Sequence, residues 1–104
     1  MRIYLCGPMT GIAEYNYPAF AAEAARLRSL GYDVVSPAEI NPDGGTWQDC
    51  MKKDIAQLVT CDVVAKLPGW AYSRGANVEI RLALELDIGV VMAGCITDAC
   101  TEAA

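Results

Sequence analysis

The chain passes from a predicted strand into a predicted helix along Leu67-Pro68-Gly69-Trp70-Ala71-Tyr72-Ser73-Arg74-Gly75-Ala76-Asn77-Val78-Glu79. The apolar run 62–67 predicts a strand that ends at the Pro-Gly pair, and the apolar spacing after the loop predicts an amphipathic helix. Ser73, Arg74 and free backbone N–H groups then surround a helix N-terminus, which is suited to binding an anion. Glu79 follows as the single carboxylate in the opening turns of that helix. This combination suggests chemistry on a nucleotide or a sugar phosphate.

Strands and helices alternate along the whole chain. Apolar runs bounded by Gly or Pro predict strands at 3–6, 33–36, 62–67 and 89–93. Helical spacing predicts helices from Pro18 to Leu30, over 46–60 and after Ser73, and we expect the tail 97–104 to be frayed or to form a short last helical turn. The alternation predicts an α/β fold, a small doubly wound, flavodoxin-like or Rossmann-like parallel sheet of four to five strands in the order 2-1-3-4, with helices on both faces.

The strand order predicts where a ligand binds. In doubly wound sheets, ligands lie at the carboxyl ends of the strands where the order reverses, which is here between strands one and three. The loops at that point are 7–16 and 68–74. The first contains Gly7-Pro8-Met9-Thr10-Gly11, which has neither the GK[ST] of a P-loop nor a GxGxxG pattern, so ATP hydrolysis and NAD chemistry are poorly supported.

Length and composition indicate one domain over residues 1–104. The chain is 54% hydrophobic and 20% charged, which fits a globular protein with a single core. No apolar run approaches the roughly 20 residues needed to span a bilayer, and the start is too short for a signal peptide, so we expect a cytoplasmic protein with no membrane partner. The net charge of −5 argues against nucleic-acid binding through a basic surface.

The residues available for catalysis are limited by the absence of histidine. The five cysteines are scattered without a CxxC pair, so no metal site is expected, and they fit small buried hydrophobes with one or two exposed thiols. Without histidine, Ser-His and Cys-His nucleophiles are excluded. Carboxylates, tyrosines and thiols remain.

Three residues are candidates for the chemistry itself. Glu79 is either a solvated helix residue near an N-terminus or a functional carboxylate at the strand ends, and its position near the unusual loop favours function. Asp54 lies at the border of an apolar helix face, and its spacing does not decide between an exposed residue paired with lysine and one that points at the strand ends. If both carboxylates share one pocket, their pKa values are driven apart and they take different roles. Tyr4 is either a core residue or the partner that holds Glu79.

Three more residues are candidates for binding. Ser73 fits a helix N-cap, and this role is compatible with binding a phosphate. Arg74 either pairs with a phosphate or is solvated. Trp70 follows a Pro-Gly pair and is a candidate for stacking on a base.

The chain resembles the nucleoside 2-deoxyribosyltransferase-like superfamily, and within it a group of short bacterial and phage proteins. The resemblance covers roughly residues 2–93. It rests on these pieces: Ile3-Tyr4-Leu5-Cys6-Gly7-Pro8-Met9-Thr10-Gly11, Asn16 with Phe20, Gly31-Tyr32-Asp33-Val34-Val35-Ser36-Pro37-Ala38-Glu39, Asp54-Ile55, Cys61-Asp62-Val63-Val64, Leu67-Pro68-Gly69-Trp70 and Ser73-Arg74-Gly75-Ala76-Asn77-Val78-Glu79.

The resemblance implies roles for the candidate residues. It implies that Glu79 is the nucleophile on the anomeric carbon, that Asp54 binds the sugar or assists departure of the base, and that Tyr4 orients the glutamate. A serine six positions before the glutamate binds the 5′-phosphate in the nucleotide hydrolase branch, and Ser73 has that spacing. The implied substrate-binding residues are Gly7, Pro8, Met9, Thr10, Gly11, Asn16, Trp70, Ser73, Arg74 and Gly75.

The resemblance also implies an activity and an assembly. The expected activity is hydrolysis of the N-glycosidic bond of a (deoxy)nucleoside 5′-monophosphate, without a metal or an organic cofactor. A nucleoside 2-deoxyribosyltransferase and a non-catalytic nucleotide-binding module are the alternatives. The expected partners are a small nucleotide or nucleoside and further copies of the chain, in a homodimer or a higher homo-oligomer.

Overall fold

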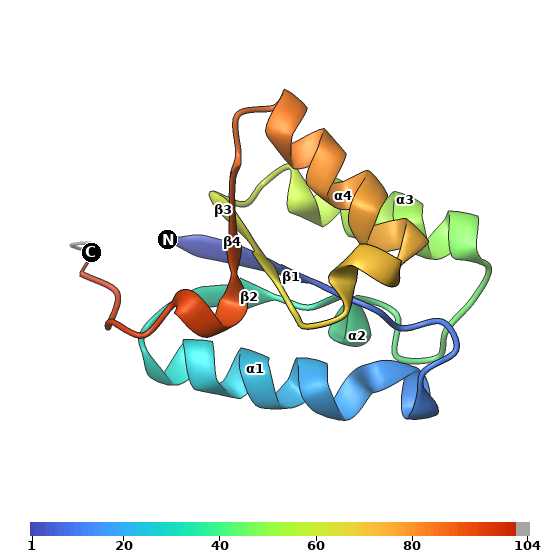
Figure 1. Cartoon of the computed structure of the whole chain (residues 1–104), viewed down its shortest axis with the longest axis horizontal. Helices are drawn as coiled ribbons and strands as arrows, with labels where there is room; N and C mark the ends of the chain where they lie inside the picture. The colour runs from blue at the N-terminus through green and yellow to red at the C-terminus, as the bar shows by residue number, and fades with distance from the viewer. Residues whose placement is uncertain (102–104) are drawn as a thin grey trace.

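The computed structural model describes residues 1–101 and is built around a four-stranded parallel sheet. The strand order is β2-β1-β3-β4 (Figure 1). The strands are β1 Arg2–Cys6, β2 Asp33–Val35, β3 Val63–Lys66 and β4 Gly89–Met92. The α-helices are α1 Tyr17–Ser29, α2 Pro37–Ile40, α3 Trp47–Leu58 and α4 Arg74–Glu85, and the short 3₁₀ turns are η1 Ala13–Asn16, η2 Trp70–Tyr72 and η3 Ala93–Cys95. The predicted α/β class and strand order are confirmed.

Helices cover both faces of the sheet, as predicted, and alternation along β1 divides the core between them. Ile3 and Leu5 are buried with apolar residues of α1, whereas Tyr4 and Cys6 are buried with apolar residues of α3 and α4. Figure 1 shows α1 along one side of the sheet and α3 with α4 along the other. Because successive side chains of a strand point to opposite faces, the register of β1 places the Tyr4 hydroxyl on the α3 and α4 side.

The helices on that side begin at capped N-termini. Thr46 Oγ1 accepts a hydrogen bond from the backbone N–H of Asp49 (3.1 Å), and Ser73 Oγ accepts one from the backbone N–H of Ala76 (3.1 Å). Each cap satisfies one of the N–H groups that the first turn of a helix leaves without a partner. Ser73 therefore fixes where α4 starts.

A glycine lets the ends of β1 and β3 come together. A Cβ atom on Gly7 would lie 2.8 Å from the Cβ atom of Leu67, closer than such atoms approach in proteins. Leu67 meanwhile donates its backbone N–H to the Cys6 carbonyl oxygen (2.8 Å). Gly7 is thus required by the close approach of the two chain segments from which the cleft loops depart.

Two segments differ from the sequence expectation. The short helix α2 was not predicted; it begins at Pro37, which suits the first turn of a helix, directly after strand β2. Residues 97–101 contain no helical turn, and Cys100 donates its backbone N–H to the Leu30 carbonyl oxygen (2.7 Å), so this part of the tail is tied to the end of α1. The rest of the tail expectation, for residues 102–104, lies outside the described residues. None of the helices in residues 1–101 combines the length and apolarity that a membrane crossing requires.

Candidate active site

A cleft of about 580 Å³ opens at the carboxyl ends of β1 and β3, where the strand order reverses. Its walls come from the loop after β1, the segment around α2, residues 47–54 of α3, and the start of α4. Within residues 1–101, three charged side chains line it: Asp54, Arg74 and Glu79. The sequence predicts a ligand site at this position, and the structure has a hollow there of the size of a small-molecule site.

Glu79 lies in the second turn of α4 and is 5% exposed, so it is not a solvated helix residue. Its Oε2 accepts a hydrogen bond from the hydroxyl of Tyr4, which is completely buried in β1. The other oxygen, Oε1, accepts no hydrogen bond from residues 1–101. Tyr4 thus holds one oxygen of the carboxyl group and leaves the other oxygen available to a ligand.

Asp54 lies in α3 and is 6% exposed, which answers the question that its spacing left open. Its Oδ1 accepts a hydrogen bond from the side-chain amide of Asn41 (2.7 Å). No residue of the described chain donates to its Oδ2. Both carboxyl groups are therefore buried in one cleft, each with one oxygen held by the protein.

Burial makes both carboxyl groups difficult to ionise. Desolvation raises the pKa of Glu79 to about 8, and the charge of Asp54 adds to this rise, while the hydrogen bond from Tyr4 opposes it. Desolvation also raises the pKa of Asp54 to about 6, and the hydrogen bond from Asn41 opposes that rise. The rise in pKa is the larger for Glu79, so Asp54 is the more readily ionised of the two carboxyl groups.

The rim of the cleft is formed by the start of α4. Ser73 caps the helix and lines the cleft, and the guanidinium of Arg74 lies over the ring of Trp47, with its Cζ 3.7 Å from the ring centroid. The first backbone N–H groups of a helix have no partner within it and carry partial positive charge. The cleft therefore has an acidic floor and a rim that favours an anion.

Comparison with known proteins places the chain in a family. The model of a domain of unknown function, DUF4406, matches residues 1–92. The chain belongs to this family. A search of curated proteins gave no significant match.

The DUF4406 chain is also similar to a solved structure of 2-deoxyribosyltransferase from the psychrotolerant bacterium Bacillus psychrosaccharolyticus, described as a biocatalyst for synthesis of antiviral and antitumoral nucleosides. The two share 24% sequence identity with a TM-score of 0.68, over 88% of this chain and 71% of the other. The resemblance read from the sequence is thereby confirmed for the fold.

Most of the sequence-predicted binding residues meet at the cleft of this DUF4406 chain, but three do not line it. Gly7, Pro8, Met9, Thr10, Ser73, Arg74 and Gly75 do. Gly11 lies outside it, and Asn16 instead donates its side-chain amide to the Pro8 carbonyl oxygen (3.0 Å), which shapes the loop. Trp70 is half-buried against the core beneath α4, with Lys66 Nζ 4.3 Å from its ring centroid, so its position gives no support to base stacking.

Sequence reasoning missed several cleft residues, of which Asn41 is the most informative. Asn41 lies just after α2 and reads as a turn residue because Pro42 follows it. A usable signal was present, since Asn41 follows the strand that pairs with β1 and so lies at the same edge of the sheet as Glu79. The aromatic residues of the cleft that were also missed are Tyr15, Tyr17, Trp47 and Tyr72.

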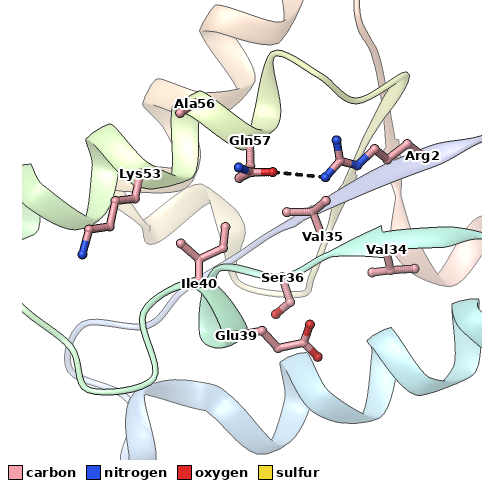
Figure 2. A pocket seen from close by; sticks show the side chains of 9 residues that line it. All are labelled: Arg2, Val34, Val35, Ser36, Glu39, Ile40, Lys53, Ala56 and Gln57. Atoms are coloured by element: carbon pink, nitrogen blue, oxygen red, sulfur yellow. Dashed lines mark hydrogen bonds between the residues drawn. The ribbon is translucent and has the colours of Figure 1, made fainter.

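A second hollow of about 470 Å³ lies along β2 and α3 (Figure 2). Among the charged side chains of residues 1–101 that line it, Arg2 and Glu39 are hydrogen-bonded to other side chains. Arg2 donates to Gln57 Oε1 (3.1 Å), and Glu39 accepts from Arg28 (2.6 and 2.7 Å). It holds no pair of buried carboxyl groups. Among residues 1–101, no three His, Cys, Asp or Glu side chains gather closely enough to hold a metal ion.

The raised pKa of Glu79 predicts how stability depends on pH. The folded chain keeps the Glu79 proton up to about pH 8, whereas the unfolded chain releases it near 4.5, so the free energy of unfolding falls as the pH rises through this range. At about 1.4 kcal/mol per pKa unit, the fall is on the order of a few kcal/mol. Urea unfolding between pH 5 and 9 should show a clearly shallower fall for Glu79→Gln.

Glu85→Gln is the matched control, because Glu85 is an exposed glutamate of the same helix. It should reproduce the slope of the unchanged protein. Equal slopes for all three proteins would contradict a buried, proton-holding Glu79.

Proposed function

We propose that this protein hydrolyses the N-glycosidic bond of a (deoxy)nucleoside 5′-monophosphate to a free base and a sugar phosphate. One observation carries the proposal: two buried carboxyl groups, Asp54 and Glu79, lie on the floor of a cleft whose rim is the capped N-terminus of α4. The fold likeness to a protein named as a 2-deoxyribosyltransferase supports the same class of bond.

The proposed reaction uses the two carboxyl groups in different roles. As the bond from the anomeric carbon to the base breaks, its electron pair leaves with the base and positive charge develops on the sugar ring. The ionised Glu79 carboxylate bonds to the anomeric carbon, as in retaining glycoside hydrolysis. Water then attacks the anomeric carbon: its hydroxyl group stays on the sugar, its proton goes to the nitrogen of the departed base, and the Glu79 carboxylate is released. Asp54 binds the sugar or assists departure of the base. Because only ionised Glu79 reacts, base release is expected to rise with pH toward about 8.

The phosphate is proposed to bind at the rim. Ser73 Oγ accepts the hydrogen bond from the Ala76 N–H, which leaves its hydroxyl hydrogen to be donated to a phosphate oxygen. Arg74 and the unpartnered N–H groups of the helix start add positive potential. Such local groups are needed because the net charge of −5 repels an anion.

A nucleoside 2-deoxyribosyltransferase is the second candidate, and the named solved relative favours it. The same carboxylate chemistry serves both, and they differ in whether water or a second base accepts the sugar. For either function we expect a cytoplasmic homodimer or higher homo-oligomer that uses no metal or organic cofactor.

The proposed hydrolysis predicts an activity that depends on Glu79. The purified protein, incubated with a panel of ribo- and deoxyribonucleoside 5′-monophosphates, should release free base, as seen by chromatography. Glu79→Gln should lower the rate by at least about 10³-fold, because a neutral amide does not attack the anomeric carbon. The control Glu85→Gln should keep full activity.

Three results would contradict the hydrolase. Full activity of folded Glu79→Gln would remove Glu79 from the reaction. Release only after an acceptor base is added would make the protein a transferase. A raised melting temperature with nucleotide but no consumption would indicate a non-catalytic binding module.

The proposed phosphate site predicts that a change at Ser73 weakens binding of the monophosphate. Ser73→Ala should raise KM for the monophosphate by about 10-fold, because a hydrogen bond to a charged group is lost, and should leave cleavage of the unphosphorylated nucleoside unchanged. Thr46→Ala is the matched control, since it removes the equivalent cap of α3 at a residue that does not line the cleft. If the two variants change the preference for the monophosphate equally, Ser73 does not bind the phosphate.

A further inference from the structure

Asn41 is held at several points beside Asp54. Its side-chain nitrogen donates to Asp54 Oδ1 (2.7 Å) and to the Pro37 carbonyl oxygen (3.2 Å), so both amide hydrogens are used. Its backbone N–H also donates to the Pro37 carbonyl oxygen (3.0 Å), and its own carbonyl oxygen accepts from the hydroxyl of Tyr17. Asn41 is 7% exposed, so these bonds are shielded from water.

The orientation of this amide is determined by its neighbours. The side-chain oxygen of Asn41 is buried and has no hydrogen-bond partner. Turning the amide over would place this oxygen against the Pro37 carbonyl oxygen, which can only accept, and would remove the N–H that Asp54 Oδ1 now accepts. The unsatisfied oxygen is therefore the cost of presenting an N–H to Asp54.

The partners of the two carboxyl groups differ in kind. The amide nitrogen of Asn41 can only donate, and a donor stabilises an ionised carboxylate more than a neutral carboxylic acid. The hydroxyl of Tyr4 can donate or accept, so it suits Glu79 in either protonation state. Burial disfavours two negative charges in one cleft, so one proton is retained by the pair.

We propose that Asn41 is a positioning residue that keeps Asp54 ionised and thereby assigns the retained proton of the pair to Glu79 before substrate binds. The proposal concerns the site of the proposed function, and its meaning for catalysis rests on that function. It implies that Glu79 must lose this proton, when substrate binds or before, so that its carboxylate can attack the anomeric carbon. The rise in pKa, larger for Glu79 than for Asp54, agrees with this assignment.

The other titratable and charged groups near Asp54 and Glu79 do not reverse the assignment of the proton to Glu79. Tyr4 and Cys6 of β1 and Tyr17 of α1 interact electrostatically with the two carboxyl groups, and burial raises the pKa of each, so they stay neutral at neutral pH. Cys50 lines the cleft from α3 itself. Arg74 is the positive group of the cleft, and its guanidinium is stacked on Trp47.

The test is a titration of the Asp54 and Glu79 side-chain carboxyl carbons by NMR, which requires no substrate. In the unchanged protein Asp54 should titrate below Glu79. In Asn41→Leu the Asp54 midpoint should rise by roughly one pH unit, because the donor is gone, and the two midpoints should approach each other. Asn41→Ser, a smaller polar replacement, should give the same shift and serves if the leucine variant does not fold.

Gln57→Leu is the matched control. It also removes a hydrogen-bonded side-chain amide from the surroundings of α3, but this amide faces Arg2 in the second hollow (Figure 2). It should leave both midpoints unchanged. An Asp54 midpoint in Asn41→Leu and Asn41→Ser equal to that of the unchanged protein, or an Asp54 that titrates above Glu79 before any substitution, would overturn the proposal.

A second readout separates positioning from mere structural support. If base release is found, Asn41→Leu should lose more kcat/KM at pH 6 than at pH 8.5, because Asp54 is then protonated at the lower pH. An equal loss at every pH would show a structural role and overturn the proposal. Absence of base release from every nucleotide would defeat the proposed function alone, since the NMR titration is independent of it.

Discussion

The hydrogen bond between the Tyr4 hydroxyl and the Glu79 carboxyl group joins the first strand to the fourth helix across the buried face of the sheet. It requires that β1 present Tyr4 on the side of α3 and α4, and that α4 begin at Ser73, so that Glu79 arrives in its second turn. A change in either register would replace this bond with an unpaired buried carboxyl group, which is costly. The alternation of β1 and the cap of α4 are therefore conditions of the site as well as of the fold.

The floor and the rim of the cleft differ in charge: the floor carries two carboxyl groups, and the rim carries Arg74 and the start of α4. Burial of Asp54 and Glu79 opposes folding at high pH, and the surrounding core and sheet must offset this cost. Ionisable groups that are held in so unfavourable a setting are typical of functional sites. Ser73 and Arg74 at the rim favour an anion, whereas the floor repels one. The proposed nucleoside monophosphate, which has an anionic phosphate and a neutral sugar, would fit this polarity in one orientation.

Much of the fold was predictable because it depends on local signals. Gly-Pro breaks and apolar runs located the strands, and their alternation with helices indicated a parallel, doubly wound sheet, for which the order 2-1-3-4 was the expectation. Glu79 was singled out because its helix follows an unusual loop. Asp54 stayed open because a border position on a helix face does not reveal what packs against it. Asn41 was missed because a residue before proline reads as a turn, and only tertiary contacts bring it to Asp54. The stacking role of Trp70 stays a prediction, because its position after a Pro-Gly pair did not reveal that its ring packs against the core and Lys66.

The central claim is that Glu79 attacks the anomeric carbon of a sugar phosphate held at the start of α4. The orientation of a sugar phosphate bound in the cleft tests this claim most directly. A crystal structure of the protein with deoxyribose 5-phosphate or ribose 5-phosphate would show it. We predict the phosphate at Ser73 and the first turn of α4, and the anomeric carbon about 3–3.5 Å from the free oxygen of Glu79. A phosphate bound elsewhere, or a sugar whose anomeric carbon points away from Glu79 in every subunit, would contradict the account.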